Sequence, residues 1–256
     1  MVVTETTQQS AGKGFLQEIS GSPNQSLLPL TAKINAQDHL EVGGCDVTEL
    51  VKQFGSPLYI MDEYSIRTAC RQYREGLKNH YSGDSLVIYA SKALNCLAIC
   101  ALVASEGLGI DVASGGELYT ALQAGVDPQT IYFHGNNKSR AELEEAIAAN
   151  CTIVADNWLE LQTLAELATN QSPRVMLRIT PGIECHTHEY IRTGHLDSKF
   201  GFDPNQVAEV LNFLVKTPNL DFVGVHAHIG SQIFEQQPHQ DLGGVLVDWL
   251  KTAQGL

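Results

Sequence analysis

The sequence has few positive charges and no long apolar run. Its 256 residues include 16 Lys and Arg against 29 Asp and Glu, which gives a formal net charge of -13. This acidic balance argues against nucleic acid or an anionic membrane as the main partner. No stretch approaches the roughly 18 consecutive apolar residues of a membrane-spanning helix, so we expect no transmembrane segment.

The cysteines lack the spacings of a disulfide framework or a zinc site. None of the six belongs to a CxxC pair, and several lie within apolar patterns. Such usage is typical of a reducing compartment, so the cytoplasm is the expected location. Residues 1–27 are polar and contain neither arginine nor the apolar core of a signal peptide. We expect them to form a disordered tail that does not target the protein.

A regular alternation of strand and helix patterns fills most of the chain. Strand-like runs begin at intervals of 21 to 23 residues, with amphipathic helices between them, at Val87, Ile110, Ile131, Ile153 and Val175. A sixth strand is predicted over residues 222–228. Strands that alternate with helices indicate βα units and a parallel sheet. Both a doubly wound sheet and a (β/α)₈ barrel fit this pattern, and the near-constant unit length favours the barrel.

Capping signals mark several helix starts. Ser139 with Glu142, and Asn157 with Glu160, have the spacing of a capping box. Before the alternation begins, residues 57–61 predict a further strand, because they form a short apolar, β-rich run.

One interval is much longer than the others. From Val175 to Phe222 it spans 47 residues, and the excess lies within residues 181–203. Because this insertion follows the C-terminal end of a strand, where α/β proteins carry their sites, we expect it to be functional. Only six strands of the alternation are predicted, too few to close an eight-stranded barrel, so we interpret the fold as an incomplete barrel.

The strand predicted over residues 87–92 carries Lys92 at its C-terminal end. Its apolar composition indicates burial on both faces, as in a parallel sheet. A partly desolvated lysine is a nucleophile that can form a Schiff base with an aldehyde. Taken alone, Lys92 fits better a side chain that extends from a strand end into solvent, and the residues that follow reverse this preference.

Other titratable residues occur at corresponding places. Asp111 lies near the end of the second predicted strand, Arg178 on the fifth and His228 on the sixth. Glu117 opens a helix just after Asp111, and a Gly-Ser turn that ends at Ser231 follows His228. An amine, an imidazole able to stack on a flat ring and a turn able to bind phosphate together match the needs of pyridoxal 5'-phosphate.

These features also have simpler interpretations. The two histidines of residues 226–228 could bind a metal, although no third ligand has convincing spacing, and the same holds for residues 185–188. Arg178 paired with Asp111 or Glu117 could be a purely structural ion pair.

Several segments resemble a known family. They read YASKA at residues 89–93, DVASGGEL at 111–118, HGNNK at 134–138 and HAHIGSQ at 226–232. This combination resembles the fold-type III pyridoxal-phosphate decarboxylases, which join an alanine-racemase-type (β/α)₈ TIM barrel to a β domain. The HGNNK segment and the run from residue 188 to 201 are similar to the branch of this family that acts on meso-diaminopimelate. The resemblance extends from about Leu40 to the end of the chain.

The resemblance implies a domain organisation and an activity. Residues 28–61 would contribute to the β domain, and residues 62–256 would form the cofactor-binding barrel, in part. The activity would be decarboxylation of meso-2,6-diaminopimelate to L-lysine and CO₂ in lysine biosynthesis, by a homodimer. Two alternatives stay open, namely decarboxylation of another basic amino acid (ornithine, arginine or carboxynorspermidine) and a catalytically inactive fragment.

The resemblance also implies residue roles. Lys92 would form the Schiff base with the cofactor, His228 would stack on the pyridine ring and Ser231 would bind the phosphate. The groups that would line the pocket and position Lys92 and His228 are Asp111, Glu117 and Arg178. Lys199 would lie near the dimer interface. The family's glycine-rich phosphate loop, its Glu-Pro-Gly-Arg segment and its Cys-Glu-Ser-Gly-Asp segment do not occur in the sequence.

Overall fold

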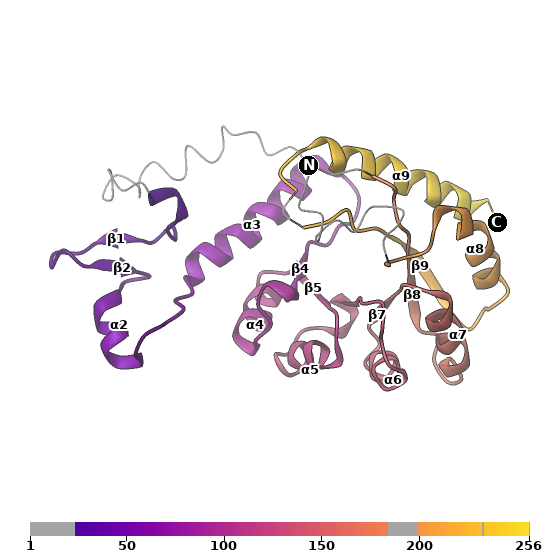
Figure 1. The fold of residues 1–256 in the computed structure, drawn as a ribbon, viewed down its shortest axis with the longest axis horizontal. Helices are drawn as coiled ribbons and strands as arrows, with labels where there is room; N and C mark the ends of the chain where they lie inside the picture. Colours follow the sequence, from indigo (N-terminus) through magenta and orange to yellow (C-terminus); the bar gives the residue numbers. More distant parts are fainter. Residues whose placement is uncertain (1–23, 184–198, 232, 256) are drawn as a thin grey trace. The chain divides into compact units, whose positions relative to one another are not determined.

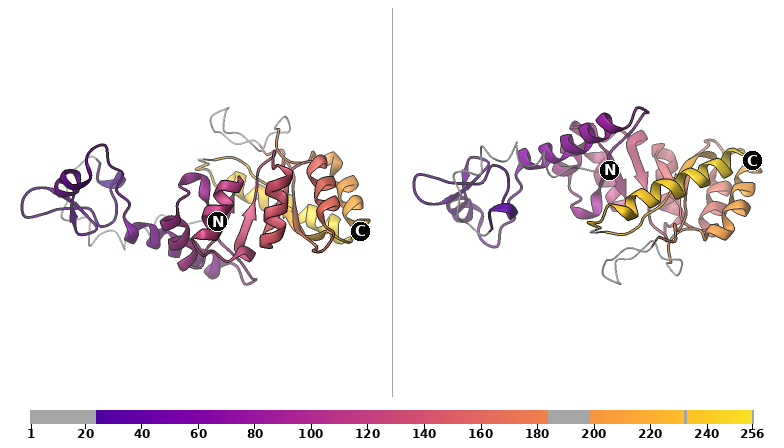
Figure 2. Two further views of the ribbon diagram at one scale, coloured as in Figure 1. Left: turned by 90° about the horizontal axis from the view of Figure 1, so that it is seen from below. Right: turned by 90° about the horizontal axis from the view of Figure 1, so that it is seen from above.

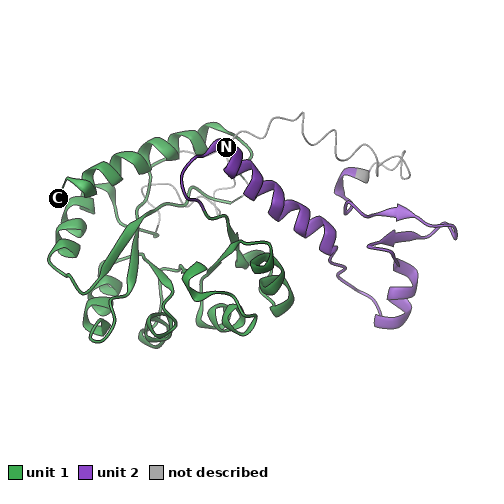
Figure 3. Ribbon diagram, turned by 180° about the vertical axis from the view of Figure 1, so that it is seen from behind, with its two compact units in different colours: residues 1, 86–256 green, residues 2–85 purple. Residues whose placement is uncertain are grey.

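The computed structural model describes residues 24–183, 199–231 and 233–255. The chain divides into two compact units, residues 2–85 and residues 86–256 (Figure 3). Most of the predicted N-terminal tail and most of the predicted insertion, with its Cys185–His188 segment, therefore lie outside the described residues. None of the helices in the described ranges is both long and apolar enough to cross a membrane.

In its described residues, the N-terminal unit contains a small antiparallel sheet, one 3-10 helix and two α-helices. Strands β1 (Lys33–Ile34), β2 (Leu40–Val42) and β3 (Cys45–Asp46) pair in that order. They are preceded by the 3-10 helix η2 (Gln25–Leu27) and followed by α2 (Val47–Phe54) and α3 (Glu63–His80). The strand predicted over residues 57–61 is wrong, because this segment pairs with no strand and leaves Tyr59 95% exposed. Contacts group α3 with this unit, and the domain boundary expected at residue 62 stays a prediction.

The second unit is built on six parallel strands. They are β4 (Ile88–Ala90), β5 (Gly109–Val112), β6 (Ile131–Phe133), β7 (Thr152–Ala155), β8 (Arg174–Arg178) and β9 (Asp221–His226). Each strand pairs with the next one along the chain. A doubly wound sheet would place its first strand in the middle of the order, whereas a barrel adds strands sequentially. The unit is therefore the partial (β/α) barrel that the sequence predicts.

Six α-helices of the described residues surround these strands, with α4 to α7 on one side and α9 along the opposite side (Figure 1). They are α4 (Leu97–Ser105), α5 (Gly115–Gln123), α6 (Arg140–Ala149), α7 (Trp158–Leu167), α8 (Val207–Val215) and α9 (Gln237–Gln254), with short 3-10 helices η3 (Ser91–Ala93), η4 (Pro128–Thr130) and η6 (Pro204–Gln206). Helix α9 lies beside β9 and α8 (Figures 1 and 2).

Side-chain alternation along the strands separates core from site. On β5, Ile110 and Val112 are fully buried, while Asp111 between them is only half-buried. On β6, Ile131 and Phe133 are likewise fully buried. Successive residues of a strand point to opposite faces, so the aliphatic face packs under the helices and Asp111 faces the barrel interior.

The predicted helix caps are confirmed with one change. Ser139 and Glu142 form a reciprocal capping box at α6. Asn157 caps α7 by accepting the backbone N–H of Glu160. The Glu160 carboxylate does not return this bond, because it accepts the backbone N–H of Asp156 instead.

The outermost strands are shorter than predicted. Strand β4 ends at Ala90, and Ser91–Ala93 turn into η3, so Lys92 lies just beyond the strand. Burial on both faces is also wrong for this strand, because in the described residues it pairs only with β5, and Ile88 is 37% exposed. Strand β9 ends at His226, which leaves His228 in the loop that follows.

Candidate functional site

The C-terminal ends of the six strands bring the predicted site residues together. The Nζ of Lys92 donates a hydrogen bond to the Oγ of Ser231, at 3.1 Å, across 139 positions of sequence. Lys92 follows β4 and Ser231 follows β9, the two ends of the sheet order. Laid flat, six strands would separate these ends by about 24 Å. The bond therefore requires the sheet to curve as a barrel does.

The His228 imidazole shares this space with Lys92. Burial, the charge of Lys92 and the charge of Arg178 lower the pKa of His228 to about 4. His228 is therefore neutral near pH 7. A neutral imidazole can lie against a flat ring without bringing a second positive charge beside the amine.

Two carboxyl groups face the same space from β5 and the start of α5. Burial raises the pKa of Asp111 to about 6, although the charge of Lys92 opposes the shift, and the charge of Glu117 adds to it. The carboxylate of Glu117 accepts the backbone N–H of Ala113 at 2.6 Å, which turns it back toward the end of β5. The carboxyl group of Asp111 therefore gains or loses its proton near pH 6.

Arg178 is buried on β8, and its partner differs from the one expected. Its Nη1 lies 3.2 Å from Oδ2 of Asp156, a residue that follows β7. The alternative interpretation, a structural ion pair of Arg178 with Asp111 or Glu117, is therefore wrong in its partner, although Asp111 still interacts with the Arg178 charge. The guanidinium carbon lies 4.5 Å from the centre of the Phe200 ring, so Arg178 also packs against the C-terminal part of the insertion.

Two further histidines complete the interior face, namely His134, to which the sequence analysis gave no role, and His226, which it considered only as a metal ligand beside His228. His134 follows β6, with its Nε2 3.7 Å from Oδ2 of Asp111 and its ring 4.6 Å from that of His226. Burial lowers the pKa of His134 to about 3 and that of His226 well below its ordinary value. The Nδ1 of His226 is buried and has no hydrogen-bond partner among the described residues. His134 and Asp156 share a signal, since each is the first residue after a strand.

These residues fit pyridoxal 5'-phosphate. The cofactor needs an amine that reaches it, a flat partner for its ring and donors for its phosphate. Lys92, His228 and Ser231 supply these groups within one space, with a buried, unpartnered imidazole nitrogen beside them. Lys92 is exposed, contrary to the partly desolvated lysine expected from the sequence. No cluster of three or more metal-binding side chains occurs in the described ranges.

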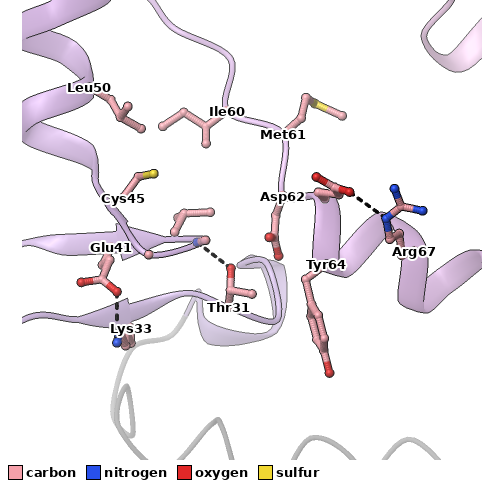
Figure 4. A pocket seen from close by; sticks show the side chains of 14 residues that line it. Thr31, Lys33, Glu41, Cys45, Leu50, Ile60, Met61, Asp62, Tyr64 and Arg67 are labelled. Carbon is pink, nitrogen blue, oxygen red and sulfur yellow. Dashed lines mark hydrogen bonds and ion pairs between the residues drawn. The ribbon is translucent and has the colours of Figure 1, made fainter. Parts of the chain in front are cut away.

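A pocket elsewhere carries none of the predicted site residues. It has a volume of about 730 Å³ and lies in the N-terminal unit, lined by residues that include Thr31, Cys45 and Asp62 (Figure 4). Its charged groups are paired with each other or with close neighbours, as in the ion pair of Lys33 and Glu41 at 3.0 Å. The pocket is thus a feature of that unit alone, and the strand ends of the barrel remain the candidate site.

Known proteins match the chain closely. It is 59% identical over 260 residues to the diaminopimelate decarboxylase of Synechocystis sp., covering 97% of this chain and 55% of the relative. It is 45% identical over 215 residues to that of Bacillus subtilis, covering 80% of this chain and 48% of the relative. The crystal structure of the M. jannaschii diaminopimelate decarboxylase in complex with L-lysine matches with a TM-score of 0.80 and 33% identity, over 88% of this chain and 54% of that one.

The chain spans about half the length of the curated relatives it matches. The chlorella virus arginine decarboxylase matches with a TM-score of 0.62 at 17% identity, which shows a common fold alone. Residues 63–243 match the family model described as "Pyridoxal-dependent decarboxylase, pyridoxal binding domain". This match covers more than half of the chain, which therefore belongs to the pyridoxal-dependent decarboxylase family.

Proposed function

We propose that the protein to which these residues belong decarboxylates meso-2,6-diaminopimelate to L-lysine and CO₂, and that this chain supplies the wall of the site that holds the cofactor. The observation that carries the proposal is the contact of Lys92 with Ser231 beside the neutral His228, at the strand ends. The substrate is proposed from the relatives, since those at 38 to 59% identity are named diaminopimelate decarboxylases.

Each residue has a role that follows from its surroundings. The amine of Lys92 attaches the cofactor, the hydroxyl of Ser231 binds its phosphate and the imidazole of His228 lies on its ring. When bound, pyridoxal 5'-phosphate supplies an electron sink for the electron pair left by the departing CO₂. The buried guanidinium of Arg178 adds a fixed positive charge that helps to keep the imidazole of His228 neutral.

Asp111 is the chain's own proton-holding group at the site. With a pKa of about 6, its carboxyl group exchanges a proton with modest change in pH, and the Lys92 amine is close enough to influence that equilibrium. The carboxylate of Glu117 favours the protonated form of Asp111 through like-charge repulsion. Asp111 and Glu117 together therefore determine how much negative charge surrounds the amine of Lys92.

Covalent trapping tests the cofactor assignment. The chain is mixed with pyridoxal 5'-phosphate, reduced with borohydride and digested, and the modified peptide is identified by mass spectrometry. We expect one modified lysine, Lys92, and loss of modification in Lys92→Ala but not in Lys251→Ala, which removes an exposed lysine of α9. If Lys92→Ala is still modified to the same extent, the assignment of Lys92 is wrong.

A second experiment tests the substrate. Because the chain covers 55% of the Synechocystis relative, it can replace the matching part of that protein to give a chimera of full length. We expect the chimera to release CO₂ from meso-diaminopimelate and not from ornithine or arginine, and to lose this activity with Lys92→Ala. Release from ornithine or arginine alone would favour the alternative of another basic amino acid.

We further propose a cytoplasmic homodimer. Five cysteines of the described ranges are free thiols, as in a reducing compartment. Lys199 is exposed at the end of the insertion, where the resemblance to the family puts the dimer interface. Sedimentation of the chimera at several concentrations tests this, and Lys199→Glu is expected to weaken the dimer. A monomer at all concentrations would contradict it.

A further inference from the structure

A buried ion pair lies behind the site, between the loop after β6 and helix α7. The Nζ of Lys138 is 2.8 Å from Oε1 of Glu160, and the two side chains are 1% and 4% exposed. Lys138 also donates to the backbone oxygens of Gly135 and Val154. Burial lowers the pKa of Lys138 and raises that of Glu160, while each charge opposes the shift of the other. Removing two charges from water costs free energy that their attraction does not always offset, so such a pair is weak evidence for stability and points to another role.

The second oxygen of Glu160 connects this pair to the site. Its Oε2 accepts the backbone N–H of Asp156 at 3.1 Å. The Asp156 side chain, 1% exposed, then makes two bonds of its own, with Nη1 of Arg178 at 3.2 Å and with the backbone N–H of Gly201 at 2.8 Å. A continuous line of charged and hydrogen-bonded groups thus runs from β6 to β8.

Both ends of this line matter for the proposed site. Arg178 is one of the charges that lower the pKa of His228. Gly201 follows Phe200, whose ring covers the guanidinium of Arg178 and whose backbone oxygen accepts the hydroxyl of Thr180. A small shift of Asp156 would therefore move the guanidinium of Arg178 and the segment of residues 199–202 together.

We propose that Glu160 is a positioning residue, which holds Asp156 through its backbone N–H so that the Asp156 carboxylate fixes Arg178 and Gly201 at the cofactor site. Lys138 keeps Glu160 in place and neutralises it. The link to the cofactor rests on the proposed function, whereas the link from Glu160 to Gly201 does not.

Two double variants separate positioning from stability. Both variants carry Lys138→Met and are named after the group at position 160. The amide variant adds Glu160→Gln, and the thioether variant adds Glu160→Met. Both remove the two buried charges, so neither leaves an unpaired ion. They differ in one property, because the introduced amide oxygen can still accept the Asp156 N–H and the introduced thioether cannot. Glu166→Gln serves as a control, since Glu166 forms an exposed pair with Arg140.

Amide hydrogen exchange on the complete chain without cofactor is the first readout. We expect the Gly201 amide to exchange about tenfold faster in the thioether variant than in the amide variant, which is the upper range of the effect of losing one hydrogen bond between neutral groups. The rate is compared with that of Ile110, a fully buried core residue, so that global unfolding cancels. Equal Gly201 rates in the two variants, relative to Ile110, would overturn the proposal.

The affinity for pyridoxal 5'-phosphate, from an absorbance titration, is the second readout. We expect about tenfold weaker binding in the thioether variant and binding close to that of the parent in the amide variant and the Glu166→Gln control. Equal affinities in the two double variants would overturn the role at the cofactor site. If the parent chain binds no cofactor at Lys92, the proposed function fails, and the exchange readout still decides the positioning by Glu160.

Discussion

Replacing His134 by glutamine is predicted to make the barrel less sensitive to acid. The His134 side chain is 17% exposed, between Asp111 and the ring of His226. Burial, with the nearby charges of Arg178 and Lys138, lowers its pKa from 6.5 to about 3. Between these two values the unfolded chain binds a proton at this position and the folded chain does not. Lowering the pH through this window therefore favours the unfolded chain.

The size of the effect follows from the two pKa values. Above pH 6.5 both states carry a neutral imidazole, so His134 adds no pH dependence. At about pH 5 the unfolded histidine is protonated, and the difference amounts to about 2 kcal/mol of unfolding free energy. Asp111, with its raised pKa, has the opposite sign, since its contribution to stability grows as the pH falls below about 6. Asp111, His226 and His228 are present in both proteins, so comparing the variant with the parent removes every contribution of these groups that does not depend on His134.

Denaturant unfolding near pH 7 and near pH 5, followed by tryptophan fluorescence, measures the effect. Both tryptophans, Trp158 and Trp249, lie in the barrel unit, so the signal does not include the N-terminal unit. We expect the parent to lose about 2 kcal/mol more than His134→Gln between the two pH values. The control His239→Gln removes an exposed histidine of α9. Equal losses in the parent and in His134→Gln would refute the argument.

Other substitutions test the remaining structural claims by the same fluorescence assay. Gly201 has φ +79° and an added Cβ would lie 3.0 Å from the backbone oxygen of Arg178, so Gly201→Ala is expected to cost about 1–3 kcal/mol. Gly125→Ala, at φ +78° with open space around it, should cost only about 1 kcal/mol, and equal losses would contradict the clash. Ser139→Ala removes the α6 cap and should cost about 1 kcal/mol, whereas an unchanged midpoint would show that the cap contributes nothing. Asp156→Asn leaves Arg178 buried without its counter-charge and should cost about 3–5 kcal/mol, most of it recovered when Arg178→Met is added.

The barrel core could be predicted from the sequence because its signals are strong and redundant. Strands β5 to β8 begin within one residue of the predicted positions. Their apolar runs are buried, and helices with defined caps separate them, so composition and periodicity agree. The outer strands β4 and β9 were predicted less well, since a pattern of apolar residues does not reveal where hydrogen bonding to a neighbouring strand stops.

Charge partners were the weakest part of the sequence prediction. The sequence offers several carboxylates for Arg178, and nothing local distinguishes Asp111 from Asp156. Strand order does distinguish them, because β8 pairs with β7 and lies three strands from β5. At about 4.8 Å between neighbouring strands, β8 lies roughly 14 Å from β5 along the sheet. This separation is too large for a direct ion pair between Arg178 and Asp111 along the sheet. Once a sequential strand order is accepted, the first acidic residue after the neighbouring strand is the better prediction.

The same reasoning explains why Lys92 and Ser231 meet although strand order separates them most. Along the sheet, neighbours are decided by strand order, which selects Asp156 for Arg178. Across the interior, neighbours are decided by curvature, which brings the residues that follow β4 and β9 within hydrogen-bond distance. A site in such a fold therefore combines two kinds of contact. Contacts between neighbouring strands can be predicted from the sequence once the strand order is known. Contacts across the interior can be predicted only when the curvature of the sheet is known as well. The residues that hold Arg178 belong to the first kind, and Lys92 and Ser231, which we propose to hold the cofactor, belong to the second. A resemblance between sequence motifs predicts roles for Lys92, His228 and Ser231 without either kind of contact, whereas strand order is needed to find Asp156 and Glu160 behind them.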